Sequence, residues 1–131
     1  MQLGKSMLKV MLIEDNQTMV SLLTTLLKME GYTVEAPTKH LIDNYLTAIL
    51  TEHPHLAFVD VNLRHGSGLD LVRRIRQEPD AVDTRIIMSS GLNLKHECLQ
   101  AGADGFIQKP FMPDDLIKLI HNTIHKKKIK K

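Results

Sequence analysis

Five chemically useful side chains of the sequence each stand at the end of a short apolar run: Glu14, Asp15, Asp60, Ser90 and Lys109. An apolar run bounded by turn-forming residues is typical of a strand buried on both faces, as in a parallel sheet. All strands of a parallel sheet end at the same edge, where open α/β sheets bind their ligands. We therefore expect the five side chains to lie close together, although Asp60 taken alone could simply cap the following turn.

Three carboxylates at one sheet edge would repel one another unless a cation lay between them. Hard oxygen ligands suit Mg²⁺, which keeps water ligands and accepts phosphate oxygens. The hydroxyl of Ser90 and the ammonium group of Lys109 beside such a metal would complete a cradle for a phosphoryl group. A metal-supported aspartate is also a known type of nucleophile, which gives an aspartyl phosphate.

Strands and helices alternate along the chain and would position these groups. The expected strands cover residues 9–13, 32–36, 56–60, 86–88 and 105–108. A helix follows each strand: one capped by Asp15 or Asn16 and ended by Gly31, then 41–52, a helix after Gly68, 94–100, and a last helix from Pro113. Strict alternation favours an α/β fold with a five-stranded parallel sheet, right-handed crossovers and helices on both faces.

Apolar spacing assigns an inward face to each of the longer helices. These faces carry Met19, Leu22, Leu23, Leu26 and Leu27 in the first helix, Leu41, Tyr45, Ala48 and Ile49 in the second, Leu69, Val72 and Ile75 in the third, and Leu116, Leu119, Ile120 and Ile124 in the last. The third helix would turn a basic face outward, formed by Arg73, Arg74 and Arg76.

Length and composition indicate one ordinary globular domain. The chain has 131 residues, of which 43% are hydrophobic and 24% charged, and no apolar run is long enough to span a membrane. The single cysteine, Cys98, excludes an internal disulfide and fits a cytoplasmic protein. Five of the 17 basic residues lie among the last six positions, so the remaining 12 face 15 acidic residues. That balance argues against direct binding of nucleic acid.

Four stretches make the sequence resemble the receiver domains of two-component response regulators, the CheY-like family. They are Val-Met-Leu-Ile-Glu-Asp (10–15), Phe-Val-Asp-Val-Asn-Leu (58–63), Ile-Ile-Met-Ser-Ser-Gly (86–91) and Ala-Gly-Ala-Asp-Gly-Phe-Ile-Gln-Lys-Pro-Phe (101–111). The resemblance implies a receiver domain over residues 8–125 with a doubly wound (βα)5 flavodoxin-like three-layer sandwich. Residues 1–7 and 126–131 would then be flexible termini or a linker.

The resemblance also implies a phosphorylation site that depends on Mg²⁺. Asp60 would accept a phosphoryl group from a phosphohistidine of a histidine kinase or phosphotransfer protein. Asp15, Asp60 and the backbone carbonyl of Asn62 would bind Mg²⁺ directly, and Glu14 would act through water. Apart from its own aspartyl phosphorylation and dephosphorylation, a domain of this family is not an enzyme.

Three further residues would sense and transmit the phosphorylation. By the same resemblance, Ser90 is the switch hydroxyl, Lys109 pairs with Asp60 and then with the phosphoryl group, and Phe106 is an aromatic residue that turns inward. The surface formed by the fourth helix, fifth strand and fifth helix would change with them. It would address a downstream protein or a lost output domain. The resemblance further implies a cis bond between Lys109 and Pro110.

The sequence departs from the family pattern in two places. Ser90 lies 19 residues before Lys109, so the fourth helix is expected to be about one turn short. Arg64 and His65 replace a Pro-acid pair that is common after the third strand, and His65 near the site mouth could tune the phosphate lifetime or be an ordinary loop residue. Leu92, two residues after Ser90, is expected to slow hydrolysis of the phosphoryl group because it is apolar.

Other functions stay open as alternatives. A receiver-like domain could bind a partner without taking phosphate, although the five polar residues argue against this. An aspartyl-phosphate phosphatase would want a second acid where Asn62 stands, and a nucleotide-binding enzyme would want a glycine-rich loop after the first strand, where Glu14 and Asp15 stand. His121 and His125 have the spacing of two metal ligands on a helix but lack an evident third, so a solvated helix face is the competing interpretation.

Overall fold

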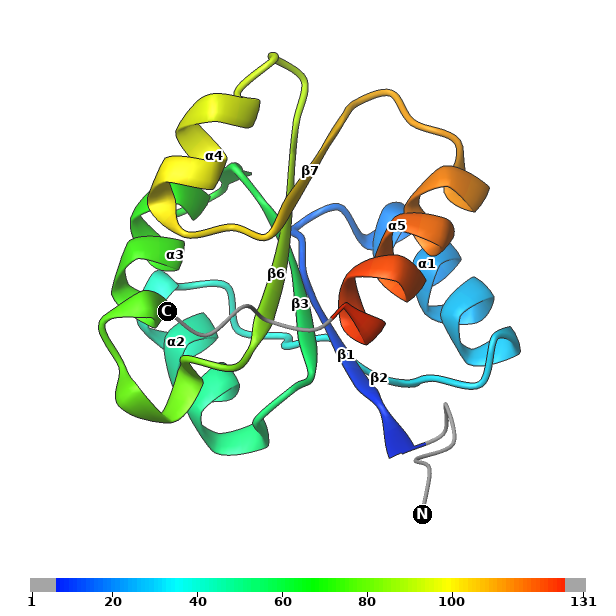
Figure 1. Cartoon of the computed structure of the whole chain (residues 1–131), viewed down its shortest axis with the longest axis horizontal. Helices are drawn as coiled ribbons and strands as arrows, with labels where there is room; N and C mark the ends of the chain where they lie inside the picture. Colours follow the sequence, from blue (N-terminus) through cyan, green and yellow to red (C-terminus); the bar gives the residue numbers. More distant parts are fainter. Residues whose placement is uncertain (1–6, 127–131) are drawn as a thin grey trace.

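A five-stranded parallel sheet forms the middle layer of the protein, as Figure 1 shows for the computed structural model, which describes residues 7–126. The strands are β1 (Lys9–Ile13), β2 (Thr33–Glu35), β3 (Leu56–Asp60), β6 (Arg85–Ser90) and β7 (Gly105–Gln108). Their order is β2-β1-β3-β6-β7, and every neighbouring pair is parallel. The predicted doubly wound sheet is confirmed. The strand order reverses direction between β1 and β3, where folds of this kind bind their ligands.

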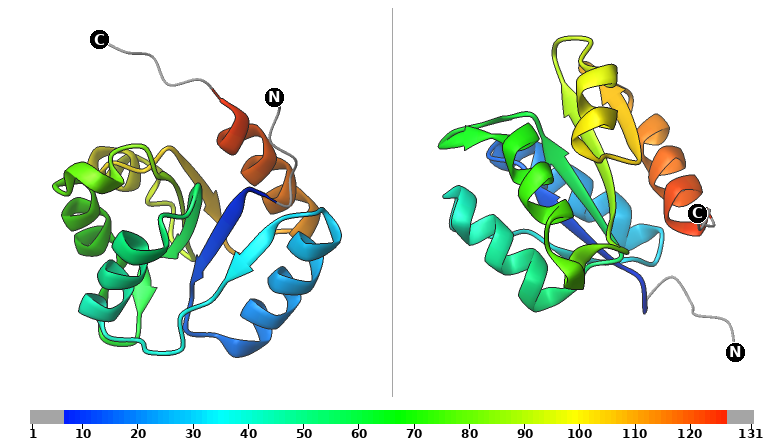
Figure 2. Two further views of the ribbon diagram at one scale, coloured as in Figure 1. Left: turned by 90° about the horizontal axis from the view of Figure 1, so that it is seen from below. Right: turned by 60° about the vertical axis from the view of Figure 1, so that its left-hand side comes forward.

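Helices cover both faces of the sheet (Figures 1 and 2). The helices α1 (Gln17–Met29) and α5 (Pro113–His125) lie on one face, and α2 (Ile42–Glu52), α3 (Gly68–Arg76) and α4 (Lys95–Ala101) lie on the other. Alternate strand residues supply the two cores. Phe58 packs with Leu23 and Leu116 beneath α1 and α5, whereas its neighbour Val59 packs with Ile75 on the opposite side. The first four residues of β3 are therefore apolar, and their burial on both faces holds Asp60 at the end of the strand.

The loop that carries Glu14 and Asp15 is held between β1 and a well-capped helix. The Asn16 side chain accepts a hydrogen bond from the Met19 main-chain N–H over 3.0 Å and caps α1, which decides between the two predicted caps. At the other end of α1, Gly31 has a φ of 95°, the left-handed conformation expected of the residue that follows a helix.

Two leucines predicted to face inward lie at the surface. Leu41 is 55% exposed because it is the extended residue before α2, which begins at Ile42, and so does not share the helical face. Leu22 is 45% exposed because the apolar face of α1 is narrow and centred on Leu23 and Leu27, which are fully buried. Consecutive helical residues differ by about 100° around the axis, which turns Leu22 away from the core.

The prediction that Arg76 lies on an outward basic face of α3 is also wrong. Its guanidinium does not belong to an outward basic face: it donates to the main-chain oxygens of Gly102 and Thr84 over 2.8 and 2.7 Å and to the Asp104 carboxylate over 3.0 Å. Burial lowers the pKa of Arg76, while the nearby Asp104 opposes that effect. Arg76 thus ties α3 to the loops at the start of β6 and β7.

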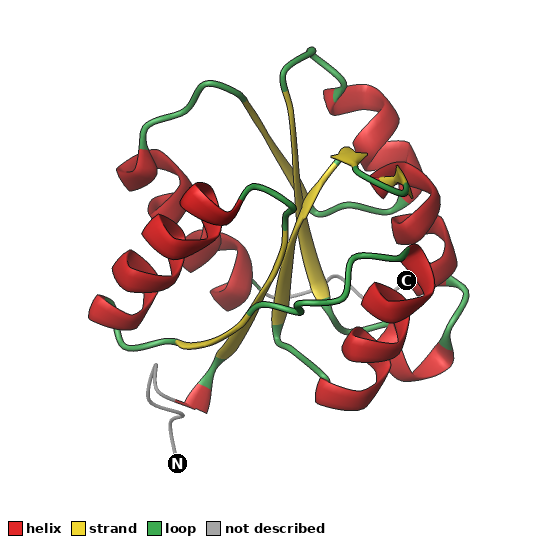
Figure 3. Ribbon diagram, turned by 180° about the vertical axis from the view of Figure 1, so that it is seen from behind, coloured by secondary structure: helices red, strands yellow, loops and turns green. Residues whose placement is uncertain are grey.

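Two small elements were not predicted. A short antiparallel hairpin of β4 (Asn62–Leu63) and β5 (Gly66–Ser67) follows β3, and a 3-10 helix, η2 (Pro79–Ala81), follows α3; Figure 3 distinguishes strands from helices by colour. The hairpin places Arg64 and His65 at a turn above the sheet edge. Between residues 7 and 126 no helix is long and apolar enough to cross a membrane. The termini predicted to be flexible or a linker, residues 1–7 and 126–131, lie outside the described residues except for Met7 and Lys126.

Candidate functional site

Two of the predicted acidic residues, Glu14 and Asp60, meet at the carboxyl edge of the sheet. Pairing in register places the ends of β1, β3 and β6 side by side, with Ile13 opposite Val59 and Asp60 opposite Ser89. Glu14 is 4% exposed and Asp60 is 5% exposed, so both carboxylates are withdrawn from bulk water. Carboxylates are rarely buried to this extent unless a cation or hydrogen-bond donors compensate them.

Lys109 supplies that compensation for two of the acids. Its Nζ donates to Asp60 Oδ2 over 2.8 Å and to Glu14 Oε1 over 3.1 Å. Burial lowers the pKa of Lys109, but the hydrogen bonds to the two carboxylates outweigh burial and raise it overall. The pKa of Glu14 is raised by burial first and by the nearby Asp60 second. The group holds more negative charge than one ammonium ion can balance.

Close backbone contacts fix the position of Asp60. Its Oδ1 accepts a hydrogen bond from the Asn62 main-chain N–H over 3.1 Å, and the Val61 N–H donates to the Ser89 carbonyl over 2.9 Å. Gly68 begins α3 against the same strand end: a Cβ on Gly68 would lie 2.1 Å from the Asp60 carbonyl oxygen. Only glycine fits here, because the neighbouring atoms are backbone.

Asp15 has a different set of partners. Its Oδ1 accepts the Tyr45 hydroxyl proton over 2.8 Å and lies 3.3 Å from His40 Nδ1, and its Oδ2 accepts the Arg64 main-chain N–H. His40 Nδ1 is also 2.6 Å from the Tyr45 oxygen. Burial raises the pKa of Tyr45, and its hydrogen bond to Asp15 raises it further. Within residues 7–126, Asp15 makes no ion pair with Lys109.

Tyr45 and His40 are therefore site residues that the sequence did not identify. Tyr45 was predicted only as part of an apolar helix face, and it is indeed fully buried. A buried tyrosine hydroxyl needs a hydrogen-bond partner, which was the one available signal. It does not name the partner, since Asp15 lies 30 positions earlier in the chain.

Ser90 and Phe106 lie on neighbouring strands beside Lys109. Ser90 is fully buried, and its Oγ accepts a hydrogen bond from the Leu92 main-chain N–H over 3.1 Å. The Lys109 main-chain N–H in turn donates to the Ser90 carbonyl over 2.8 Å. Phe106 is half-buried on β7 and packs against the core beneath α2, α3 and α4. The Lys109–Pro110 bond is cis, as the resemblance implied.

The donor set matches the chemistry of a hard divalent cation. Glu14, Asp15 and Asp60 offer only oxygen ligands, which Mg²⁺ prefers, and the Glu14 and Asp60 carboxylates share the single ammonium group of Lys109. The side chains are not arranged around an ion: across residues 7–126, no three Asp, Glu, His or Cys residues converge closely enough to hold one. Both Asp15 oxygens already accept a hydrogen bond, from the Tyr45 hydroxyl and from the Arg64 main-chain N–H.

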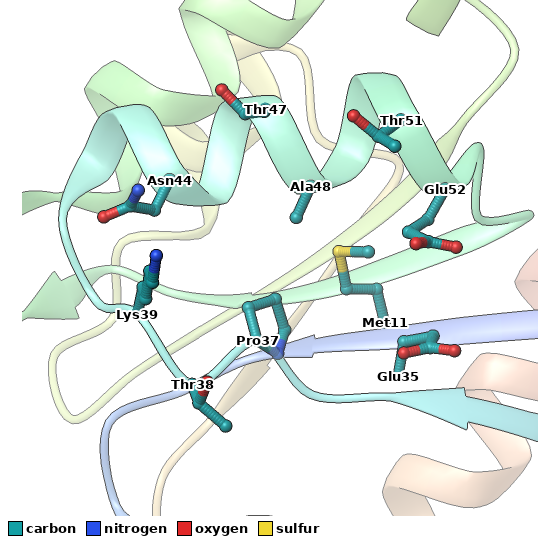
Figure 4. Close-up of a pocket in the computed structure, with 10 residues that line it drawn as sticks. All are labelled: Met11, Glu35, Pro37, Thr38, Lys39, Asn44, Thr47, Ala48, Thr51 and Glu52. Atoms are coloured by element: carbon teal, nitrogen blue, oxygen red, sulfur yellow. The ribbon is translucent and has the colours of Figure 1, made fainter.

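Other polar features do not extend this site. His65 and Leu92 are exposed at its rim. His121 and His125 contact each other on α5 with ring centroids 4.6 Å apart, and no third candidate ligand joins them in the described part of the chain. A separate open pocket lies between α2 and the connection from β2, where Pro37, Lys39 and Asn44 surround it (Figure 4). Its lining includes none of the five predicted site residues.

Comparison with known proteins agrees with this arrangement. The model of the response regulator receiver domain family matches residues 10–121. The cell cycle transcriptional regulator CtrA of Caulobacter vibrioides is 30% identical over 124 residues, which cover 92% of the chain and 52% of CtrA. The chain thus spans about half the length of this relative.

Solved structures give the same result. The chemotaxis response regulator CheY4 of Vibrio cholerae matches with a TM-score of 0.81 and 25% identity over 89% of the chain and 98% of CheY4. The receiver domain of the sensor histidine kinase PA1611 from Pseudomonas aeruginosa, whose structure has a magnesium ion in the active-site cleft, matches in fold with a TM-score of 0.79 and 23% identity over 91% of the chain and 98% of that domain. Fold and family model agree, and the chain belongs to the response regulator receiver domain family.

Proposed function

We propose that residues 8–125 form a phosphoacceptor receiver of a two-component system, with Asp60 as the residue that is phosphorylated. The observation that carries the proposal is the position of Lys109, whose ammonium group binds Asp60 Oδ2 and whose main-chain N–H binds the Ser90 carbonyl. A nucleophile, a cation and a hydroxyl-bearing strand end are thereby connected within one small site. Glu14 also binds Lys109, but the Asp60 contact is the shorter, 2.8 against 3.1 Å, and Asp60 ends β3 beside β6, the strand that ends at Ser90.

The transfer step balances with the groups at hand. An Asp60 carboxylate oxygen would attack the phosphorus of a phosphohistidine, forming a P–O bond while the P–N bond breaks. The histidine nitrogen leaves with the bonding electron pair. Lys109 would then bind the transferred phosphoryl oxygens. The Ser90 hydroxyl, whose oxygen accepts a hydrogen bond from the Leu92 main-chain N–H, would leave that partner and donate its own proton to the phosphoryl oxygens. Hydrolysis by water would return Asp60 to its carboxylate.

Mg²⁺ is the cofactor that the donor set favours. Glu14, Asp15, Asp60 and the backbone carbonyl of Asn62 would hold it, with Glu14 acting through water. When bound, Mg²⁺ would neutralise the carboxylates and the phosphoryl oxygens during transfer. This proposal agrees with the excess negative charge around Glu14 and Asp60, which a single ammonium group leaves uncompensated.

Phosphorylation would be transmitted along β6 and β7. Ser90 is paired with Gln108, and Met88 is paired with Phe106, so a shift of the Ser90 loop would be carried to Phe106 along the two paired strands. Phe106 would turn further inward, as a shift between two existing populations. The α4–β7–α5 face would then change its affinity for a downstream protein or an attached output domain. Exposed Leu99 and Met112 lie on elements of this face or beside them.

The partners follow from the family. Receiver domains interact with histidine kinases or phosphotransfer proteins, and one of these would supply the phosphoryl group in the cytoplasm. Beyond its own phosphorylation and dephosphorylation, the domain would catalyse no reaction. Neither nucleic acid nor a membrane would be its direct ligand.

Incubation with acetyl phosphate and Mg²⁺, followed by mass spectrometry, tests the assignment. Wild type should gain one phosphoryl group, Asp60→Asn should gain none, and Asp70→Asn should behave as wild type. Asp70 is a suitable control because it is an exposed acid whose only described partner is Arg73. Beryllofluoride with Mg²⁺ should shift the amide resonances of Ser90, Phe106 and Lys109 in wild type but not in Asp60→Asn. Equal labelling of wild type and Asp60→Asn would overturn the assignment.

A further inference from the structure

Both oxygens of Asp15 are bound by groups other than Lys109, whereas Glu14 and Asp60 each accept a main-chain N–H on one oxygen and bind Lys109 with the other. Tyr45 and His40 face Oδ1, and the Arg64 main-chain N–H donates to Oδ2. We call these three groups the Asp15 clamp. By contrast, Glu14 and Asp60 both bind Lys109. The acids of the site are thus divided into two groups with separate partners.

The directions of the hydrogen bonds follow from their chemistry. The Tyr45 hydroxyl donates its only proton to Asp15, so its oxygen is left to accept from His40 Nδ1, 2.6 Å away. Each donor in this chain thereby strengthens the next. A carboxylate that accepts such hydrogen bonds is partly neutralised by the donors, so its electrostatic attraction for a cation is weaker.

The clamp is anchored in rigid structure. Tyr45 is fully buried in the first turns of α2, and the edge of its ring meets His40 with centroids 5.8 Å apart. His40 belongs to the connection between β2 and α2, the segment that also borders the pocket in Figure 4. Arg64 lies at the turn of the β4–β5 hairpin. A proline at this position would have no N–H to donate, so the third donor depends on the residue type found here.

We propose that the Asp15 clamp competes with Mg²⁺ for the Asp15 carboxylate and lowers the Mg²⁺ affinity of this receiver. This inference rests on the proposed function, because it takes Asp15 as a metal ligand. Tyr45 and His40 are positioning residues in this scheme, since they act through Asp15 and touch no reacting atom. Metal binding would release the Tyr45 hydroxyl from Asp15.

The decisive variant is Tyr45→Phe, which removes the hydroxyl and keeps the buried ring. Isothermal titration with MgCl₂ should show about tenfold tighter binding than wild type, because a hydrogen bond to a charged group is lost only from the metal-free state. Tyr32→Phe is the matched control: its hydroxyl lies 3.3 Å from His121 on α5, remote from Asp15, so its Mg²⁺ affinity should equal that of wild type. Unchanged affinity in Tyr45→Phe would overturn the clamp, and weaker binding would mean that Tyr45 instead orients Asp15 as a ligand, which also overturns it.

A spectroscopic measurement covers the case in which Tyr45→Phe does not fold. The chain has two tyrosines and no tryptophan, so in Tyr32→Phe the tyrosine emission comes from Tyr45 alone. Emission should rise along the Mg²⁺ binding curve as the phenol leaves the quenching carboxylate, and constant emission during binding would overturn the clamp. Failure of the proposed function is distinguishable, because wild type and every variant would then lack both Mg²⁺ binding and acetyl phosphate labelling.

Discussion

Replacing Gly68 by alanine tests how tightly the phosphorylation site is built into the backbone. An alanine Cβ would lie 2.1 Å from the Asp60 carbonyl oxygen, 2.9 Å from the Asp60 carbonyl carbon and 3.0 Å from the Val61 Cα. All three atoms are backbone of a fully buried strand or the residue after it. The clash cannot be relieved by rotating a side chain, so α3 and β3 must move apart.

The size of the effect can be worked out from competing terms. Overpacking costs about 1–3 kcal/mol, and separation would weaken the 2.7 Å hydrogen bond from the Gly68 N–H to the Val61 carbonyl, which is worth about 1 kcal/mol. Alanine returns up to about 1 kcal/mol by restricting the unfolded chain. We expect Gly68→Ala to lower the free energy of unfolding by about 2–3 kcal/mol.

Urea denaturation followed by circular dichroism measures this loss as a midpoint lower by about 1–2 M. Gly91→Ala is the matched control, because no atom lies within 4 Å of the position of its added Cβ, and its stability should stay within about 0.5 kcal/mol of wild type. Acetyl phosphate labelling of any folded Gly68→Ala should also slow, since Asp60 moves with its carbonyl. Equal midpoints for the two alanine variants would refute the reasoning.

Four further predictions concern other parts of the molecule. Arg76→Met should lower the free energy of unfolding by about 2–4 kcal/mol, whereas exposed Arg73→Met should change it by less than about 0.5 kcal/mol; similar urea midpoints would contradict this. Because the pKa of Glu14 is raised in the folded state, its folded form holds a proton that the unfolded chain releases, so stability falls as pH rises above the ordinary value of 4.5. Glu14→Gln should remove that slope and raise the urea midpoint at pH 7 without Mg²⁺; a lower midpoint would be the opposite result. Burial raises the pKa of Cys98 to about 11, so iodoacetamide at pH 8 should label it at least about a hundredfold more slowly than the unfolded chain, and equal rates would show that the thiol is accessible. Leu92→Glu should shorten the phosphoryl half-life, and an unchanged half-life would exclude a role of Leu92 in limiting water access.

The positions of the strands along the chain were predictable because the signals for them are local. Apolar runs in β1, β3 and β6 end at turn-forming or polar residues, and parallel pairing then brings their ends together without further information. Leu41 and Leu22 show the limit of periodicity. A helix boundary shifted by one residue removes Leu41 from the face, and the width of a buried face depends on what packs against it, which no single helix sequence records.

The polar interior was less predictable than the sheet because its partners are distant in sequence. Arg76 looks like one of three arginines on a basic face, and only the folded loops around Gly102 and Thr84 reveal that its guanidinium has carbonyl acceptors. Tyr45 similarly looks like a core residue, which it is, while its hydroxyl belongs to Asp15. In both cases the apolar part of the side chain satisfies the pattern and the polar tip is decided by tertiary structure.

The division of acids in this site has a consequence for how Lys109 behaves. Lys109 is the only described cation bound to Asp60 and Glu14, so any divalent ion that compensates these carboxylates weakens the hold on its ammonium group. Its main chain remains bonded to the Ser90 carbonyl and directly follows β7. The freed ammonium group of Lys109 could therefore follow a phosphoryl group while its main chain stays bonded to Ser90. In the proposed scheme the Asp15 clamp would oppose the binding of that ion, so the Asp15 carboxylate would couple the metal site to the nucleophile and to the signalling strand.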